Sequence, residues 1–471
     1  MRQKTIIVSN RLPVTIEQHK NEFEVQASNG GLISALGSIY PGEDSIWIGW
    51  NGIVADEDNK EQLNEIAADL SEQNLVPVSL TEDQVEGFYN GFTNSVIWPV
   101  FHDQLSRVSA RDSYWDTYLE VNAIFSDIVA EYASPEDVIW IHDIQLMLVP
   151  GMLRSRGLMN KIGFFSHIPF PKVETAIRMP GITALLDSLQ SADLVGFYLD
   201  EYIRNFKDTI AYFNPLYDAT ADENSSNEFS VKAFPMGIDF DKYFELSRTD
   251  VVRRKASQLR GEFDVEKVIG CVCRLDYTKG IPNLLLAYEA LLSRHQNLRT
   301  KVKLVLLLVP SREDVVAYQD IRKEIFAKVE QVNADFGSSG WEPVKLWYKS
   351  VNDQVLSSIY RSCDVMVIPS LSDGMNVVCK EYVASRKEKG VLVLSRWAGA
   401  SQELNIGALI IDPFNITELG DAIWRGLKMT VNEQNRRMGM MRRRLISNNV
   451  NTWRRNFLTA LEERKELKSV K

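Results

Sequence analysis

The sequence predicts an α/β protein with two domains, each built on a parallel sheet. Short apolar runs alternate with longer segments of helical period, a pattern typical of parallel sheets covered by helices. The chain has 471 residues, which is more than one hydrophobic core usually serves. A polar, acidic stretch over residues 217–228 separates two sets of apolar runs, and we place the domain boundary near residue 240.

The apolar runs predict where the strands lie. In the first half of the chain we expect strands over residues 5–9, 45–49, 138–142, 162–167 and 194–197. In the second half we expect them over residues 268–274, 302–309, 364–368, 391–394 and 409–411. Helical periodicity is clear over residues 115–132, 281–295, 315–336 and 418–429.

These elements predict two Rossmann-like domains, over residues 1–240 and 241–450. A C-terminal helix over residues 451–471 follows, and we expect it to pack back at the domain junction. In parallel α/β sheets, ligands bind beyond the carboxyl ends of the strands. Two such sheets facing each other would therefore bind their ligands in a central cleft.

Composition and charge exclude several classes of protein. Hydrophobic residues make up 45% of the chain and charged residues 25%, the balance of a globular protein. The formal net charge of −10 argues against a nucleic-acid partner, which would need a basic face. The longest apolar run is too short to span a bilayer, and the N-terminus shows no signal-peptide pattern. We therefore expect a cytoplasmic protein with no membrane partner; a homo-oligomer is compatible with the sequence.

The cysteines predict neither disulfides nor a metal site. Cys271 and Cys273 alternate along one apolar strand, and Cys363 and Cys379 stand apart from them. A metal site would need further Cys or His at ligand spacing, and the chain has only five His. We expect buried free thiols, no metal and no cofactor.

Two basic residues follow a predicted strand in the second half. Arg274 ends the strand, and Lys279 precedes Gly280 and a helix. Cations beside a helix N-terminus suit a diphosphate. From the residues alone, two solvated surface cations are an equally good interpretation.

A second candidate segment is the Asp-Gly-Met-Asn turn at residues 373–376, with Glu381 two helical turns further on. Asp373 and Glu381 offer carboxylates to sugar or ribose hydroxyls, and the N–H groups of the turn offer hydrogen bonds to a ligand. An Asp that caps a helix, with an exposed Glu, is the commoner situation for such residues.

The first half offers polar residues at three strand ends. Arg11 ends the first strand, and Gly30 and Gly31 lie further along; a hairpin turn explains the glycines equally well. His142 and Asp143 follow one strand and His167 another, where they suit an acceptor hydroxyl and a sugar. A lone His at a strand end is more often structural. P-loop, Gly-x-Gly-x-x-Gly and Gly-x-Ser-x-Gly motifs are absent, which argues against kinase, dehydrogenase and serine hydrolase functions.

In this order along the chain, the segments closely resemble the trehalose-6-phosphate synthase family, the retaining GT-B glycosyltransferases of family 20. The resemblance covers residues 5–453. Its blocks are residues 8–11, 30–32, 88–92, 98–99, 140–143, 167–171, 274–280, 310–312, 373–376, 380–383 and 399–404. It implies a GT-B fold and transfer of glucose from a nucleotide-glucose, UDP-glucose above all, to glucose 6-phosphate.

The resemblance also implies roles for individual residues. The donor side would comprise Arg274 and Lys279 with Gly31 on the diphosphate, Asp373, Gly374, Met375 and Asn376 on the sugar, and Glu381 on the ribose. The acceptor side would comprise Arg11 and Arg312 on the phosphate, Tyr89 and Trp98 around the pocket, and Asp143 at a hydroxyl. His167 would lie at the transferred sugar. Front-face attack would retain the anomeric configuration, with the cations offsetting charge on the leaving diphosphate.

Three positions depart from the family pattern. Ile144 replaces a Tyr near the acceptor phosphate, Tyr198 replaces Gln or His, and Ser372 replaces Arg. Ile144 and Tyr198 favour another phosphorylated acceptor, such as glycerol 3-phosphate or a cyclitol phosphate, whereas Arg11, Tyr89 and Trp98 favour glucose 6-phosphate. A catalytically silent sugar-phosphate sensor is a third hypothesis, opposed by the intact donor residues.

Overall fold

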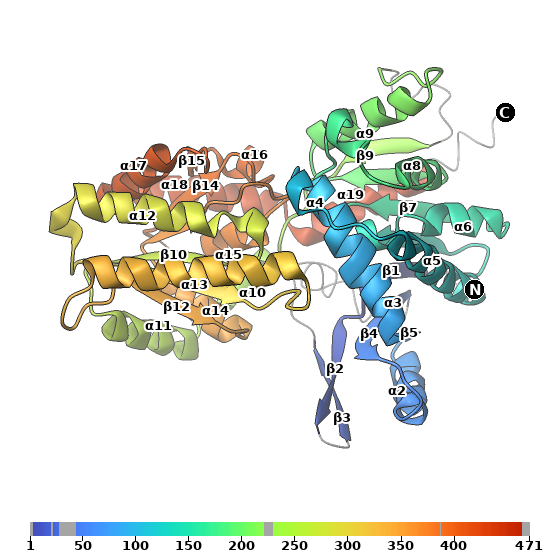
Figure 1. Cartoon of the computed structure of the whole chain (residues 1–471), viewed down its shortest axis with the longest axis horizontal. Helices are drawn as coiled ribbons and strands as arrows, with labels where there is room; N and C mark the ends of the chain where they lie inside the picture. The colour runs from blue at the N-terminus through green and yellow to red at the C-terminus, as the bar shows by residue number, and fades with distance from the viewer. Residues whose placement is uncertain (1–2, 20–21, 28–43, 221–228, 387, 464–471) are drawn as a thin grey trace. The chain divides into compact units, whose positions relative to one another are not determined.

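The computed structural model describes residues 3–19, 22–27, 44–220, 229–386 and 388–463. The chain forms two compact units (Figure 1). The first unit combines Met1–Met236 with Val450–Lys471, and the second is Gly237–Asn449. Each unit is an α/β structure on a parallel sheet, so the predicted fold class is confirmed.

The first unit is built on a seven-stranded sheet with the order β5-β4-β1-β6-β7-β8-β9. Every neighbouring pair in it is parallel. Its strands are β1 (Thr5–Arg11), β4 (Ser45–Val54), β5 (Leu75–Leu80), β6 (Val138–His142), β7 (Lys161–Phe165), β8 (Leu194–Phe197) and β9 (Ser230–Ala233). The strands β2 (Val14–His19) and β3 (Glu22–Ala27) form a separate antiparallel ribbon, in which β2 contacts β4 (Figure 1).

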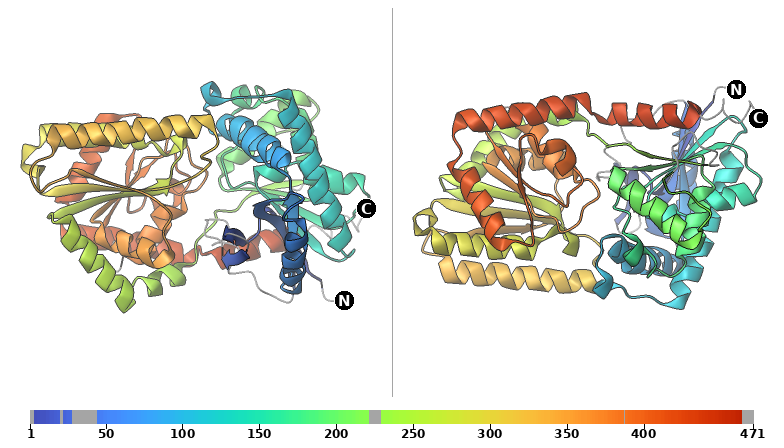
Figure 2. Two further views of the ribbon diagram at one scale, coloured as in Figure 1. Left: turned by 60° about the horizontal axis from the view of Figure 1, so that its bottom comes forward. Right: turned by 90° about the horizontal axis from the view of Figure 1, so that it is seen from above.

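Helices lie on both faces of the first sheet (Figure 2). They are α2 (Lys60–Glu72), α3 (Glu82–Gln84), α4 (Trp98–Phe101), α5 (Asp112–Tyr132), α6 (Val149–Ser155), α7 (Val173–Ala176), α8 (Ile182–Gln190), α9 (Asp200–Phe213) and α19 (Val450–Glu463). The described part of this unit also contains a π-helix, η1 (Val85–Ile97), and two 3-10 turns, η2 (Leu105–Arg107) and η3 (Ile144–Leu146).

The second unit is built on a six-stranded sheet with the order β12-β11-β10-β13-β14-β15. Its pairs are likewise parallel. Its strands are β10 (Lys267–Arg274), β11 (Val302–Val309), β12 (Val344–Tyr348), β13 (Val365–Ile368), β14 (Val391–Ser395) and β15 (Leu409–Ile411). Residues Leu304 to Leu308 of β11 are completely or almost completely buried. Burial of each such leucine contributes roughly 1.5–3 kcal/mol.

Helices also cover both faces of the second sheet (Figure 2). They are α10 (Phe240–Leu246), α11 (Asp250–Phe263), α12 (Ile281–Arg294), α13 (Val316–Phe336), α14 (Asp353–Ser362), α15 (Val377–Ser385), α16 (Ser401–Leu404), α17 (Ile416–Lys428) and α18 (Val431–Ser447). Two 3-10 turns, η4 (Tyr277–Lys279) and η5 (Gln296–Leu298), precede and follow α12.

Every strand and helix predicted from periodicity is present, with ends that differ by a few residues. The predicted C-terminal helix is present as α19, and residues 464–471 of that prediction lie outside the described residues. The strands without a prediction are β2 and β3 of the ribbon and three edge strands, β5, β9 and β12. These three edge strands lack the continuous apolar run that is typical of a central strand. Among the described residues, no helix is long and apolar enough to cross a membrane.

The C-terminal helix α19 packs on the first sheet. Its residue Phe457 lies over β7 and β8, where the two strands carry Gly163 and Gly196. A Cβ atom added at either glycine would lie 2.7 Å from the Phe457 ring. These glycines therefore provide the space that lets the helix approach the sheet closely.

Candidate active site

The end of β10 carries the basic residues of the second unit. Arg274 is exposed at the end of the strand, and the turn η4 follows, capped by Asp276, whose Oδ1 accepts from the Thr278 N–H at 2.9 Å. Gly280 then begins α12 with φ +66°, and a Cβ there would lie 2.0 Å from the Pro369 carbonyl oxygen. Only glycine lets this loop close against the segment that follows β13.

Asp276 lies at the centre of a group of cations. Its Oδ2 accepts a hydrogen bond from the Tyr318 hydroxyl at 3.1 Å and lies 3.5 Å from Nη1 of Arg312. Burial acts to raise the pKa of Asp276, but the fields of Arg312, Lys279 and Arg274 outweigh it, so this pKa is lower than usual. Asp276 is thus a buried anion at neutral pH. Sequence reasoning gave it no role, although its position between two basic residues is a usable signal.

Asp373 is joined to this group through Lys279. Its Oδ2 accepts from Lys279 Nζ at 2.8 Å, from Asn376 Nδ2 at 3.0 Å and from Ser370 Oγ at 3.3 Å. The Lys279–Asp373 ion pair and the turn that begins at Asp373 lie at the ends of neighbouring strands, because β10 and β13 pair in parallel. The structure therefore brings together Lys279 and Asp373, two of the residues predicted to bind the donor.

The turn after Asp373 is held by backbone hydrogen bonds to the loop after β14. Asp373 N–H donates to the Trp397 carbonyl at 3.1 Å, and Ala400 N–H donates to the Met375 carbonyl at 2.7 Å. Asn376 has φ +81°, and its Oδ1 accepts from the Cys379 N–H to cap α15. In the described part of the chain, the N–H groups of residues 374–376 make no hydrogen bond. These groups are oriented by the turn and available to a ligand.

Glu381 follows Lys380, which forms a buried ion pair with Glu403. Its own oxygens accept from the hydroxyls of Tyr243 at 3.0 Å and Tyr360 at 2.7 Å. Burial raises the pKa of Glu381, against the two tyrosine hydrogen bonds. A ribose hydroxyl would have to share this carboxylate with the tyrosines.

Arg312, expected at the acceptor phosphate, lies in the second unit with Asp276. Its side chain is 4% exposed, its backbone has φ +51°, and its Nη1 contacts the Tyr318 hydroxyl. Gly31, expected at the diphosphate, lies outside the described residues.

In the first unit, the Arg11 side chain lies over the ring of Trp50. Its guanidinium carbon is 4.2 Å from the centre of the Trp50 ring, and Tyr89 contacts the same indole with ring centres 6.2 Å apart. Burial lowers the pKa of Arg11 from its ordinary value, while the field of Tyr89 acts to raise it. Gly52 has φ +94°, and a Cβ there would lie 1.9 Å from Nη1 of Arg11. Sequence reasoning missed Trp50 and Gly52, which place this arginine.

The ends of β6 and β7 bring Asp143 and His167 together. The backbone N–H of His167 donates to Oδ1 of Asp143 at 3.2 Å, and the backbone N–H of Asp143 donates to the Phe165 carbonyl at 2.8 Å. Asp143 has φ +73°, a left-handed conformation that Asp tolerates better than most residues. Nδ1 of His142 lies 3.1 Å from Nε2 of His167.

The remaining predicted position and the three departures lie in packed or partly covered surroundings. Trp98 is buried and its ring lies tilted against that of His102, with ring centres 4.1 Å apart. Ile144 is fully buried, and its carbonyl accepts from the Tyr118 hydroxyl at 2.7 Å. Tyr198 is buried and Ser372 partly exposed. A side chain at position 144 of this chain therefore belongs to the core of the first unit.

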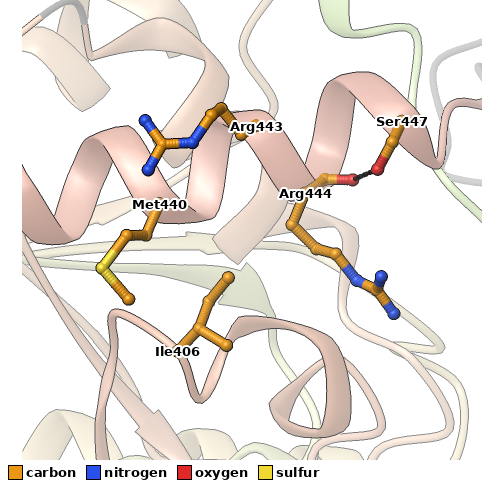
Figure 3. Close-up of a pocket in the computed structure, with 5 residues that line it drawn as sticks. All are labelled: Ile406, Met440, Arg443, Arg444 and Ser447. Atoms are coloured by element: carbon orange, nitrogen blue, oxygen red, sulfur yellow. Dashed lines mark hydrogen bonds between the residues drawn. The ribbon is translucent and has the colours of Figure 1, made fainter.

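A surface pocket of about 340 Å³ lies elsewhere, along α18 of the second unit (Figure 3). Its lining residues are Ile406, Met440, Arg443, Arg444 and Ser447. The Arg443 and Arg444 side chains point in different directions (Figure 3), and none of the predicted site residues lines this pocket. Among the described residues, no group of His, Cys, Asp and Glu is arranged to hold a metal ion. All four cysteines are free thiols.

The chain is similar to known proteins along nearly its whole length. The alpha,alpha-trehalose-phosphate synthase [UDP-forming] of Pichia angusta is 38% identical, covering 97% of this chain and 98% of that protein. The bifunctional trehalose-6-phosphate synthase/phosphatase of Thermoproteus tenax is 36% identical, and the chain spans 63% of its length. A solved trehalose-6-phosphate synthase, OtsA, has a TM-score of 0.86 and 33% identity, covering 98% of this chain and 99% of that one.

A further solved relative is the Burkholderia xenovorans alpha,alpha-trehalose-phosphate synthase (UDP-forming) in complex with glucose-6-phosphate. It has a TM-score of 0.87 and 30% identity, covering 98% of this chain and all of that one. The two parallel-sheet units and their likeness to these solved enzymes thus define a GT-B glycosyltransferase. The model of the family described as glycosyltransferase family 20 matches residues 3–463. The chain belongs to glycosyltransferase family 20.

Proposed function

We propose that this chain transfers glucose from UDP-glucose to glucose 6-phosphate with retention, giving trehalose 6-phosphate and UDP. The observation that carries the proposal is the joined group of Arg274, Asp276, Lys279 and Asp373 at adjacent strand ends. It occurs in a chain that matches relatives named as UDP-forming synthases along nearly its whole length. A relative has also been solved bound with UDP-2-fluoro glucose.

The donor diphosphate is bound by the cations that Asp276 gathers. The Lys279 ammonium has three protons and directs one at Asp373, which leaves two for phosphate oxygens. Arg274 is exposed at the strand end and offers its planar fork to the same group. These charges offset the negative charge that develops on UDP as it leaves. Because the protein supplies the cations, the reaction as proposed uses no metal ion and no cofactor.

The transferred glucose is held by the Asp373 turn. The oriented N–H groups of Gly374, Met375 and Asn376 donate to sugar hydroxyl oxygens, and the Asp373 carboxylate accepts from sugar hydroxyl groups. Glu381, in its tyrosine-bonded position, accepts a further hydrogen bond from the ribose.

The acceptor phosphate is bound by Arg11, which lies over Trp50, with Arg312 as a second cation. Tyr89 and Trp98 shape the pocket of the acceptor sugar, and Asp143 orients its attacking hydroxyl. In the bond-making step, that hydroxyl oxygen bonds to the anomeric carbon as the bond to UDP breaks. The proton passes to the departing phosphate oxygen, so Asp143 positions the acceptor without having to remove its proton.

We place the enzyme in the cytoplasm, where both substrates are charged solutes, and we propose no nucleic-acid partner. Ile144 and Tyr198, which depart from the family pattern, favour another phosphorylated acceptor. The test therefore includes glycerol 3-phosphate and a cyclitol phosphate. A homo-oligomer remains compatible with the proposal.

The test is an activity matrix. Purified protein is incubated with UDP-, GDP- and ADP-glucose against glucose 6-phosphate, glycerol 3-phosphate and inositol phosphate, with and without EDTA. We expect UDP release with UDP-glucose and glucose 6-phosphate, insensitive to EDTA, and an α,α-linked product by NMR. Release with glycerol 3-phosphate alone would refute the acceptor. No release from any pair would refute the enzyme and favour a sugar-phosphate sensor.

A further inference from the structure

Two imidazoles share a proton at the ends of β6 and β7. His142 is the last residue of β6 and fully buried, whereas His167 follows β7 and is partly exposed. At 3.1 Å, Nδ1 of His142 and Nε2 of His167 are within hydrogen-bond distance. One proton must lie between them, because two lone pairs would repel. Either His142 donates from Nδ1 or His167 donates from Nε2.

Both rings are neutral, so this one choice fixes all four nitrogens. Burial, and then the neighbouring His167, hold the pKa of His142 well below its ordinary value, and burial lowers the pKa of His167 to about 3. A neutral imidazole carries one proton and one lone pair. If His142 donates from Nδ1, its Nε2 is a lone pair and His167 carries its own proton on Nδ1.

The aromatic residues behind His142 distinguish the two arrangements. Trp140 of β6 and Trp453 of α19 lie 4.6 and 6.4 Å from His142, ring centre to ring centre, and 5.0 Å from each other. In the described part of the chain, the buried indole Nε1 atoms of both tryptophans and Nε2 of His142 make no hydrogen bond. Indole nitrogens can only donate. A proton on Nε2 would make His142 a third buried donor without an acceptor in this cluster, whereas a lone pair there adds no further buried N–H group.

We propose that His142 donates from Nδ1 to Nε2 of His167 and thereby holds His167 as its Nδ1–H tautomer. His142 is then a positioning residue, and His167, which is partly exposed, carries its N–H donor on Nδ1. The proposed function gives this donor its target, a hydroxyl oxygen of the transferred glucose. Asp143 fixes the same turn through the His167 backbone.

A neutral donor suits this position. The transferred sugar gains positive charge as its bond to UDP breaks, so a protonated imidazolium beside it would oppose the reaction. A ring with a lone pair on Nδ1 would accept from a hydroxyl but could not donate to one. The fixed tautomer therefore provides a hydrogen bond without adding a charge, and it needs no reorganisation during the reaction.

The primary test reads the tautomer directly and does not depend on turnover. The full chain is labelled with ring-¹⁵N histidine, and long-range ¹H–¹⁵N correlation spectra are recorded at neutral pH. The signals of His167 are those lost in His167→Gln. We expect a protonated Nδ1 and an unprotonated Nε2 on His167. A protonated Nε2 on His167 overturns the proposal.

Two variants of nearly equal shape test the positioning role. His142→Asn keeps an N–H donor near the place of Nδ1, and His142→Leu removes it. We expect His142→Leu to lose the Nδ1–H preference of His167 and to lower kcat at least about tenfold, with a smaller change in KM. His142→Asn should keep the His167 tautomer and lose clearly less activity. Equal losses in the two variants, or none in His142→Leu, would overturn the positioning role.

The two proposals fail separately. Wild-type protein with the expected tautomer and no UDP release from any substrate pair would refute the proposed function and leave the histidine assignment standing. Active protein with a protonated His167 Nε2 would do the reverse. If His142→Leu does not fold, the wild-type spectrum still decides the tautomer.

Discussion

Gly52→Ala offers a direct test of how Arg11 is positioned. A methyl group at residue 52 would lie 1.9 Å from Nη1 of Arg11, where ordinary contacts begin near 3.4 Å. The guanidinium must therefore move by roughly 1.5 Å, off its position over Trp50. A misplacement of about 1 Å can cost a factor of about 100 in a positioned reaction.

The magnitude follows from the bond that is lost. A hydrogen bond to a charged group contributes about 1.5–3 kcal/mol. If Arg11 binds the acceptor phosphate, Gly52→Ala should raise KM for glucose 6-phosphate by about 10- to 150-fold at 1.4 kcal/mol per factor of ten. The KM for UDP-glucose should change little, because Arg11 belongs to the acceptor side. Initial rates of UDP release with each substrate varied in turn measure both constants.

Gly157→Ala is the matched control. Gly157 also has a positive φ, +81°, but a Cβ there would meet nothing within 4 Å. Both variants strain the backbone by about 1–2 kcal/mol, and both should lower the melting temperature. Only Gly52→Ala displaces Arg11. The reasoning is refuted if the two variants have the same KM for glucose 6-phosphate, or if Gly52→Ala weakens UDP-glucose equally.

Three further variants address the second unit. Arg274→Ala should lower turnover at least about 100-fold, as loss of a transition-state charge partner does, and a near-wild-type rate in the UDP assay would remove Arg274 from the mechanism. Asp276→Asn should reduce the melting temperature more at pH 7 than at about pH 3. A carboxyl whose folded pKa is lowered stabilises the fold above its unfolded pKa and loses that stabilisation as pH falls through the folded pKa. Equal losses in melting temperature at the two pH values would contradict this. Glu381→Gln should raise the melting temperature relative to wild type more at pH 8 than at pH 4. The pKa of Glu381 is raised in the folded protein, so folding favours its protonated form and wild-type stability falls as pH rises. A difference in melting temperature that does not change with pH would show that ionisation of the buried Glu381 does not destabilise the fold.

The central part of both sheets could be predicted from the sequence. Strands such as β6 and β11 are buried on both faces and read as apolar runs. The edge strands β5, β9 and β12 could not, because proline or polar residues interrupt their apolar runs, whereas the edge strand β15 is wholly apolar and was predicted. Pro77 in β5 even argues against a strand, although proline is tolerated at an edge.

The site divides in the same way. Residues at strand ends, such as Lys279 and Asp373, were predictable as candidates because parallel strands end at one edge of a sheet. Their partners were not. Asp276 is an ordinary turn aspartate in the sequence. Gly52 acquires its role only because the fold brings Arg11, 41 residues before it in the sequence, beside it. Such roles arise from tertiary contacts that no local pattern records.

The position of α19 in the first unit has a consequence for biosynthesis. The ribosome makes the first-unit sheet, then the whole second unit, and only then the helix whose Phe457 occupies the space over Gly163 and Gly196. The second unit is continuous in sequence and can fold as it emerges. The first unit must instead wait, with the aromatic surface beside His142 uncovered, until translation has passed residue 457. Nascent chains stalled before α19 are therefore the form of this protein most in need of a chaperone.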